Sequence, residues 1–185
     1  MPVLGMVEFA GIAAGIRASD AMVKAAPVEL IESRPTTPGK YISLVTGDVA
    51  SVEASVRAGI HAAGDASVLD SFVLANLHEQ VLPSIRGTQS MPELDALGVL
   101  ESTTAASIIK AADAACKAAP VTLVRLHLAM HIGGKGYVTF VGSVADVGAA
   151  LEAGRRAASD QWLDEALIPN PYAEIWEHLK RTLDW

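Results

Sequence analysis

The segment Ser19-Asp20-Ala21-Met22-Val23-Lys24-Ala25-Ala26-Pro27-Val28-Glu29-Leu30 decides the fold, because a second version of it follows in the same chain. That second version is Ala112-Asp113-Ala114-Ala115-Cys116-Lys117-Ala118-Ala119-Pro120-Val121-Thr122-Leu123. Upstream, Leu4-Gly5-Met6-Val7-Glu8 recurs at the same offset as Leu97-Gly98-Val99-Leu100-Glu101. The recurring Gly, Pro, Asp and Lys positions argue against a chance effect of high alanine content. The sequence is therefore a tandem repeat.

The match continues downstream with small shifts. Lys40-Tyr41 corresponds to Lys135 and Tyr137, after a short insertion in the second copy, and residues 69–82 resemble residues 163–176. A polar run with Gly and Pro, residues 86–93, joins the copies. The 185 residues thus divide into two expected domains, 1–88 and 93–185, each large enough for a small core.

Each copy is expected to run strand, helix, strand, strand, helix, strand, and then a terminal helix. In the first copy the apolar patterns predict strands at 3–9, 28–33, 41–46 and 68–74, and helices at 12–26, 49–63 and 79–85. The second terminal helix is expected at 173–183. The βαββαβ order predicts an α+β, ferredoxin-like fold. Such a sheet has one face without helices of its own, so burial against another copy or subunit is expected.

The composition argues against several classes of function. Hydrophobic residues make up 51% of the chain, charged residues 19%, and the net charge is −7, which argues against disorder and against binding to nucleic acid or an anionic membrane. No apolar stretch approaches the roughly 20 residues of a membrane span. The single cysteine excludes an internal disulfide and a zinc site of cysteine pairs. We find no catalytic constellation and no metal-ligand cluster, and therefore expect neither an enzyme nor a cofactor.

These motifs resemble a known family. The runs at 5–8, 20–26 and 47–49, with their second copies at 98–101 and 113–119, are similar to the signature of bacterial microcompartment shell proteins. Two copies in one chain indicate the tandem-domain class. Residues 70–76, 121–125 and 132–135 are especially similar to tandem shell proteins of propanediol-utilising compartments.

The resemblance implies a homotrimer with the outline of a hexamer. Such pseudohexameric tiles pack beside other shell proteins, enclose enzymes, and pass small metabolites through a central pore. The expected location is the shell of a bacterial microcompartment in the cytoplasm. The alternative left open by the residues is a trimeric ferredoxin-like cytoplasmic regulator or small-ligand-binding protein.

Two loops are the expected pore lining on this resemblance. The first contributes Thr36, Thr37, Pro38 and Gly39, and the second contributes His131, Ile132, Gly133 and Gly134. Ordinary turns between strands are the plainer interpretation. Thr37 stands where an iron–sulfur-bearing relative has cysteine, and a hydroxyl is not a cluster ligand, so no cluster is expected. His131 is either an exposed loop residue or one of three pore imidazoles that could hold an adventitious metal.

Four further residues are expected where tiles meet. Lys24 and Lys117 occupy equivalent helix ends, where a lysine also interacts favourably with the helix dipole. Asn76 and Asn170 stand where the family often has an edge arginine, which puts the strength of lateral contacts in doubt. The tryptophans at 162, 176 and 185 are expected to cover the second core or the trimer interface.

Overall fold

The computed structural model describes residues 3–87 and 92–181, so the ends of the two predicted domains and part of their joint lie outside the described residues. Its first half contains four strands and three α-helices: β1 (Val3–Phe9), α1 (Ile12–Ala25), β2 (Glu29–Thr36), β3 (Lys40–Gly47), α2 (Val49–Ala63), β4 (Val68–Leu74) and α3 (Val81–Ile85). A short 3-10 turn, η1 (Asp65–Ser67), precedes β4.

The second half repeats this order. It consists of β5 (Ala96–Ser102), α4 (Ala105–Ala118), β6 (Thr122–Leu128), β7 (Gly136–Gly142), α5 (Val144–Ala158), η2 (Ser159–Gln161), β8 (Trp162–Ile168) and α6 (Ala173–Arg181). The βαββαβ order expected from the repeat is present in both halves.

Each half forms a four-stranded antiparallel sheet with the same topology. The strand orders are β2-β3-β1-β4 and β6-β7-β5-β8, and β1 and β5 occupy equivalent central positions. Glu8 faces Asp70 across the strand pair β1–β4, and Glu101 faces Asp164 across β5–β8. The two copies therefore match in register as well as in sequence.

Local signals explain both boundaries of α2. Asp48 caps α2 by accepting the Ser51 N–H at 2.9 Å, and Gly64 ends that helix with a φ of 81°. The prediction was wrong by a few residues at β2, which starts one residue late and runs to Thr36. The connection expected between the strands at 28–33 and 41–46 therefore shortens to a turn over 37–39, because pairing with β3 extends to Thr36 opposite Lys40.

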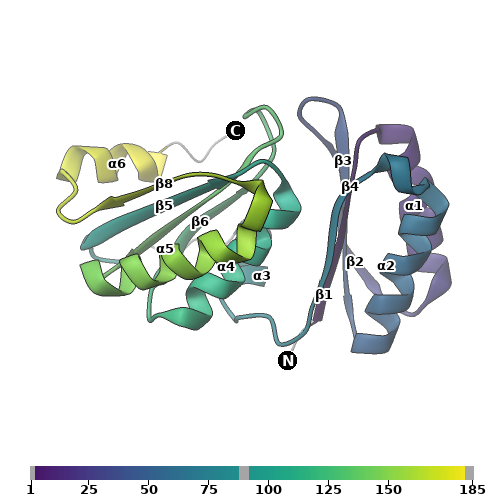
Figure 1. Cartoon of the computed structure of the whole chain (residues 1–185), viewed down its shortest axis with the longest axis horizontal. Helices are drawn as coiled ribbons and strands as arrows, with labels where there is room; N and C mark the ends of the chain where they lie inside the picture. The colour runs from purple at the N-terminus through teal and green to yellow at the C-terminus, as the bar shows by residue number, and fades with distance from the viewer. Residues whose placement is uncertain (1–2, 88–91, 182–185) are drawn as a thin grey trace.

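The two halves pack on each other asymmetrically. In Figure 1 the first sheet stands between its own helices, α1 and α2, and the second half of the chain. One core unites the outer face of this sheet with α4, including Met6, Leu44 and Phe72 from the sheet and Ile109 and Ala112 from the helix. Helix α4 contacts both β1 and β4. The sheet face that lacks helices of its own is thus buried by the second copy.

The outer face of the second sheet has a different cover. Helix α6 lies along it (Figure 1), and Trp176 is buried there in a small cluster with Leu97, Val124 and Val141. Trp162 is 37% exposed, and Trp185 lies outside the described residues. Only Trp176 among these therefore covers the second half in the described part of the chain.

Candidate functional site: an interface between domain copies

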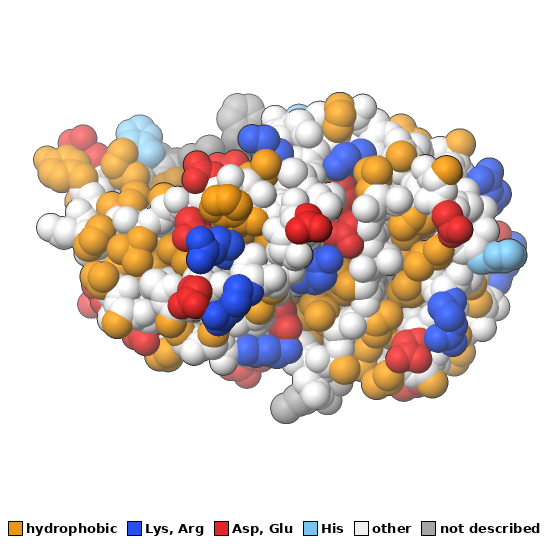
Figure 2. All heavy atoms as spheres, in the orientation of Figure 1, with side chains coloured by type: hydrophobic (Ala, Val, Ile, Leu, Met, Phe, Trp, Pro, Cys, Tyr) orange, Lys and Arg blue, Asp and Glu red, His pale blue; other side chains and the backbone are white. Residues whose placement is uncertain are grey.

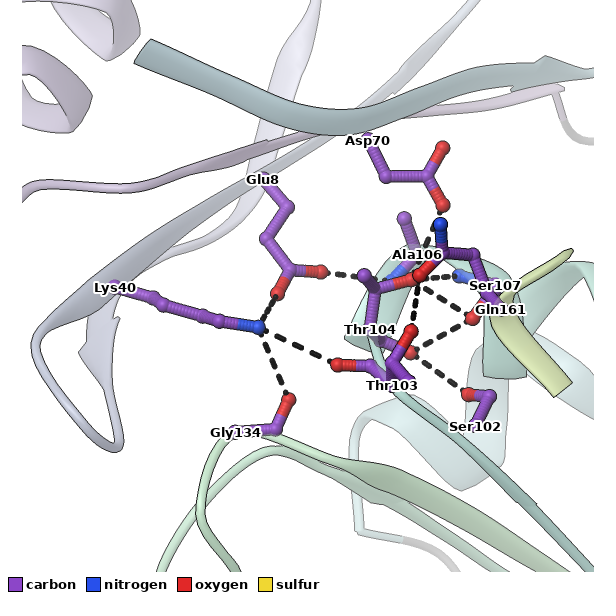
Figure 3. A network of polar contacts seen from close by, with 10 residues as sticks. All are labelled: Glu8, Lys40, Asp70, Ser102, Thr103, Thr104, Ala106, Ser107, Gly134 and Gln161. Carbon is purple, nitrogen blue, oxygen red and sulfur yellow. Dashed lines mark hydrogen bonds and ion pairs between the residues drawn. The ribbon is translucent and has the colours of Figure 1, made fainter. Parts of the chain in front are cut away.

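A buried carboxylate lies at the centre of the contact between the halves. The Glu8 side chain has no exposed surface, and its Oε1 lies 3.0 Å from the Lys40 Nζ. Its other oxygen accepts the N–H of Ala106 at 3.1 Å, in the first turn of α4. Figure 3 shows the Glu8 side chain reaching from the first sheet to this helix end, where the helix dipole favours negative charge.

Lys40 extends this contact to the loops of the second half. Its ammonium donates to the carbonyl oxygens of Thr103 and Gly134, each at 3.4 Å (Figure 3). One lysine therefore ties Glu8, the start of α4 and the loop between β6 and β7 together.

A second ion pair joins the first sheet to α4. Lys110 of α4 donates to both carboxylate oxygens of Asp70 at 3.1 Å, and the Thr104 hydroxyl donates to Asp70 at 3.1 Å. Thr104 also caps α4 by accepting the Ser107 N–H at 3.0 Å. This ion pair was not expected from the sequence, although Asp70 recurs as Asp164 and Arg17 stands where the second copy has Lys110.

Burial dominates the electrostatics of Glu8. Loss of solvent raises the pKa of this carboxyl above its ordinary value of 4.5, against the opposing effects of Lys40 and of the amides at the start of α4. The ion pair and the amide bonds thus only partly offset the desolvation of Glu8.

The second sheet carries the same polar groups without a partner half. Glu101 lies 3.7 Å from Lys135, and their side chains are 40% and 52% exposed. Asp164, the counterpart of Asp70, is also exposed. Glu101 and Asp164 line a small hollow together with Val99, Glu165 and Ala166. The end of the second sheet that carries Glu101 and Asp164 is therefore open to solvent.

Helix α1 is the exposed counterpart of α4. Ile12, Ile16 and Val23 are 43%, 55% and 40% exposed, while Ile109, the counterpart of Ile16, is completely buried. Exposed clusters of large apolar side chains mark interaction surfaces. The described chain thus carries one filled interface, while the exposed face of α1 and the open polar end of the second sheet belong to an equivalent one.

The predicted pore loops lie side by side (Figure 1). The His131 N–H donates to the Thr37 hydroxyl at 2.9 Å. Gly134 has a φ of +81°, and a Cβ there would come within 2.6 Å of the Thr37 carbonyl oxygen, so glycine permits this approach. Pro38, Gly39, His131 and Gly133 are exposed, Thr37 and Ile132 are half-buried, and Thr36 and Gly134 are buried.

His127 of β6 contacts both ends of the second loop. The His127 ring stacks on Tyr137 with 5.1 Å between ring centroids, and its Nε2 lies 2.6 Å from the Met130 carbonyl oxygen. These contacts hold both ends of the longer loop between β6 and β7.

Two predicted edge residues, Asn76 and Lys117, line one hollow of about 700 Å³ together with Leu77, His78, Glu79, Leu82 and Pro83. Lys117 pairs with Asp113 at 2.5 Å, and the other oxygen of Asp113 accepts the His78 N–H at 2.8 Å. Lys24 is exposed and pairs with Asp20 at 2.6 Å. Asn170 is also exposed.

The charge on the face seen in Figure 2 is dispersed. On the face seen in Figure 2, acidic and basic side chains alternate between apolar ones. Within residues 3–87 and 92–181, no group of three His, Cys, Asp or Glu side chains has a metal-site arrangement. The described helices include none that is long and apolar enough to span a bilayer.

Comparison with known proteins assigns the fold to a family. The sequence pattern of the BMC domain family matches this chain twice, at residues 3–77 and 96–171. The bacterial microcompartment shell protein PduT of Citrobacter freundii is 40% identical over 95% of this chain and 96% of its own. The carboxysome shell protein CcmK2 of Thermosynechococcus vestitus is also 40% identical, over 50% of this chain and 97% of its own length.

A solved structure agrees over nearly the whole chain. The crystal structure of a microcompartments protein from Desulfitobacterium hafniense DCB superposes with a TM-score of 0.85, is 46% identical, and covers 98% of this chain and 99% of that one. The chain belongs to the BMC-domain family. It is a tandem-domain shell protein of a bacterial microcompartment, and this family is structural rather than enzymatic.

Proposed function

We propose that three copies of this chain close head to tail into a pseudohexameric shell tile with a central pore. The observation that carries the proposal is the second interface, whose α1 face and polar sheet end lie open in the single chain. The second sheet offers the polar groups that the first sheet uses, and α1 offers the apolar side chains that α4 uses. A head-to-tail contact between different surfaces makes a ring when its rotation closes. Three two-domain chains related in this way have six BMC domains.

The register of the filled interface predicts the contacts of the unfilled one. Because Glu8 accepts the Ala106 N–H, Glu101 of one copy is expected to accept the Ala13 N–H of the next. Because Asp70 binds Lys110, Asp164 is expected to bind Arg17 of the next copy. The apolar side chains of α1 then lose their exposure beside these charge pairs.

The two turn regions between strands are the proposed pore lining. They already touch within one chain through Thr37 and His131, so closure of the ring would alternate them about the axis. Exposed Pro38, Gly39, His131 and Gly133 offer backbone and imidazole groups to small polar metabolites. The lining loops contain no acidic residue.

The outer edge of the tile is the proposed contact with other shell proteins. Lys117 and Asn76 share one hollow, and Lys24 and Asn170 are expected to share the equivalent place across a subunit boundary. Enzymes enclosed by the shell are proposed as further partners. Membership of the shell family favours this function over the regulator considered above.

Charge reversal across the new interface tests the proposal. We expect Arg17→Glu or Asp164→Arg alone to abolish the trimer, and the two together to restore it. Sedimentation velocity over a concentration series measures the assembled mass. Arg57→Glu is the matched control, because Arg57 forms an exposed ion pair with Glu53 on α2 and not on α1 or the second sheet. Single variants that assemble like the unchanged chain would contradict the proposed contact.

A further inference from the structure

The last helices of the two halves, α3 and α6, pack on different surfaces. Helix α3 lies on the edge strand of the other half, where the Gln80 amide donates to the Val121 carbonyl at 3.0 Å and accepts the Leu123 N–H at 2.8 Å. Helix α6 instead folds back onto the outer face of its own sheet. Equivalent segments of one repeat thus bind non-equivalent surfaces.

Helix α6 covers an apolar region that the repeat assigns to another subunit. Trp176 is 5% exposed and packs with Leu97, Val124 and Val141. The counterpart of Leu97 is Leu4, which lies in the core shared between the halves. Val99, which packs against the Trp176 cluster, is likewise the counterpart of Met6 in that core. The apolar end of the second sheet is therefore occupied in the single chain.

We propose that α6 is a self-inhibitory cap on the subunit interface, which must leave its own sheet before α1 of a second copy can dock. This inference rests on the proposed trimer. The displaced α6 then binds the next subunit, at the place equivalent to the one that α3 occupies in the filled interface. That place on the next subunit is β2, where Leu30 is 41% exposed while its counterpart Leu123 is 1% exposed.

The cap makes assembly conditional. Helix α6 has nine residues and is too short to be stable alone in water, so it either covers its own sheet or binds the neighbouring subunit. The open polar end, with Glu101 and Asp164, remains available for a first encounter. Docking of α1 and release of Trp176 are then coupled steps, and the free chain keeps its apolar face covered until they occur.

A reversible disulfide tests the cap. Val141→Cys with Trp176→Cys joins two side chains of the α6 cluster, and Val141→Cys with Ile175→Cys is the matched control, since Ile175 is 51% exposed. Native Cys116 is buried, and burial raises its pKa to about 12, which limits its reaction. We expect the first pair to close under mild oxidation and to hold the chain as a monomer at concentrations where the reduced form is mostly trimer.

The outcomes separate the cap from the trimer. An oxidised first pair that assembles as fast as its reduced form, or a first pair that closes no faster than the control, would overturn the cap alone. A chain that stays monomeric in both redox states, and without the substitutions, would contradict the proposed trimer and the cap with it. Trp176→Ala gives a second readout, an association rate at least tenfold faster than that of the unchanged chain.

Discussion

Helices α1 and α4 have the same length and nearly the same pattern, yet their surroundings differ. Each has 14 residues and a lysine in its last turn. Ile16 of α1 is 55% exposed, while Ile109 of α4 is fully buried because the first sheet lies against it. The burial of this helix face is thus determined by the presence of a neighbouring domain copy, and α1 lacks that neighbour in the single chain.

The two helix starts also differ. Thr104 caps α4 and donates to Asp70, whereas Gly11 precedes α1 and provides no side-chain cap. The contact within the chain therefore has one more side-chain anchor than the contact expected between chains. We expect the second to be the weaker of the two.

The largest predicted effect is a difference in monomer stability between a substitution in α4 and one in α1. Ile109→Ala should lower the free energy of unfolding by about 2–5 kcal/mol, because it opens a cavity in the shared core. Ile16→Ala should change the unfolding of the monomer by less than about 0.5 kcal/mol, since the side chain is exposed there. Urea unfolding of dilute, monomeric protein measures both values.

Assembly should reverse that order of sensitivity. At concentrations where the unchanged chain is trimeric, Ile16→Ala should weaken association measurably. Equal losses of monomer stability in both variants would mean that α1 is already covered in the single chain, and the comparison would fail.

Much of this architecture could be predicted from the repeat alone. Recurrence of Gly5 as Gly98 and of Pro27 as Pro120 placed equivalent strands and helix ends, and an uncovered sheet face was expected from the layer arrangement. Periodicity could not decide which helix covers that face, because α1 and α4 have the same pattern. It also gave no sign that α6 would fold back onto its own sheet.

The next effect concerns pH. Folding raises the pKa of Glu8 above its ordinary value of 4.5. At a pH between 4.5 and this raised pKa, the folded chain therefore keeps a proton on Glu8 that the unfolded chain has lost. The Glu8 contribution to stability therefore grows as pH falls through that window. Glu8→Gln should remove this dependence, whereas Glu101→Gln should leave the stability of the monomer unchanged. Urea unfolding of dilute protein from pH 7 to pH 4 measures the slope, and identical slopes for Glu8→Gln and the unchanged chain would contradict it.

The smallest effect is expected at the tile edge. Lys24→Ala combined with Lys117→Ala should leave the trimer intact and reduce the order of two-dimensional sheets, because exposed lysines contribute little to folding stability. Negative-stain microscopy measures the sheets. Arg57→Ala with Arg156→Ala is the control and removes two exposed i,i+4 ion pairs from α2 and α5, whereas the Asp113 partner of Lys117 is only 6% exposed. Sheets of normal order in the lysine variant would refute the edge role.

Residues of the candidate site were predictable to the degree that they recur. Lys24 and Lys117 were found through the repeat, and Glu8 recurs as Glu101 in the same way. Thr36 was expected in the pore lining but is buried at the end of β2, because strand pairing continues further than the Pro-containing sequence indicates. Contacts between residues distant in sequence, such as Asp70 with Lys110, require the packed halves and were not predicted.

Head-to-tail docking of α1 on the second sheet is the central claim, and mixing two cysteine variants tests it most directly. One variant carries Ile16→Cys and the other Val99→Cys, and each is oxidised alone and after mixing. The account predicts a disulfide-linked pair of chains only in the mixture, because each new contact joins α1 of one copy to β5 of another. Cross-linking of Ile16→Cys to itself, or no cross-link in a mixture that sediments as a trimer, would contradict the account.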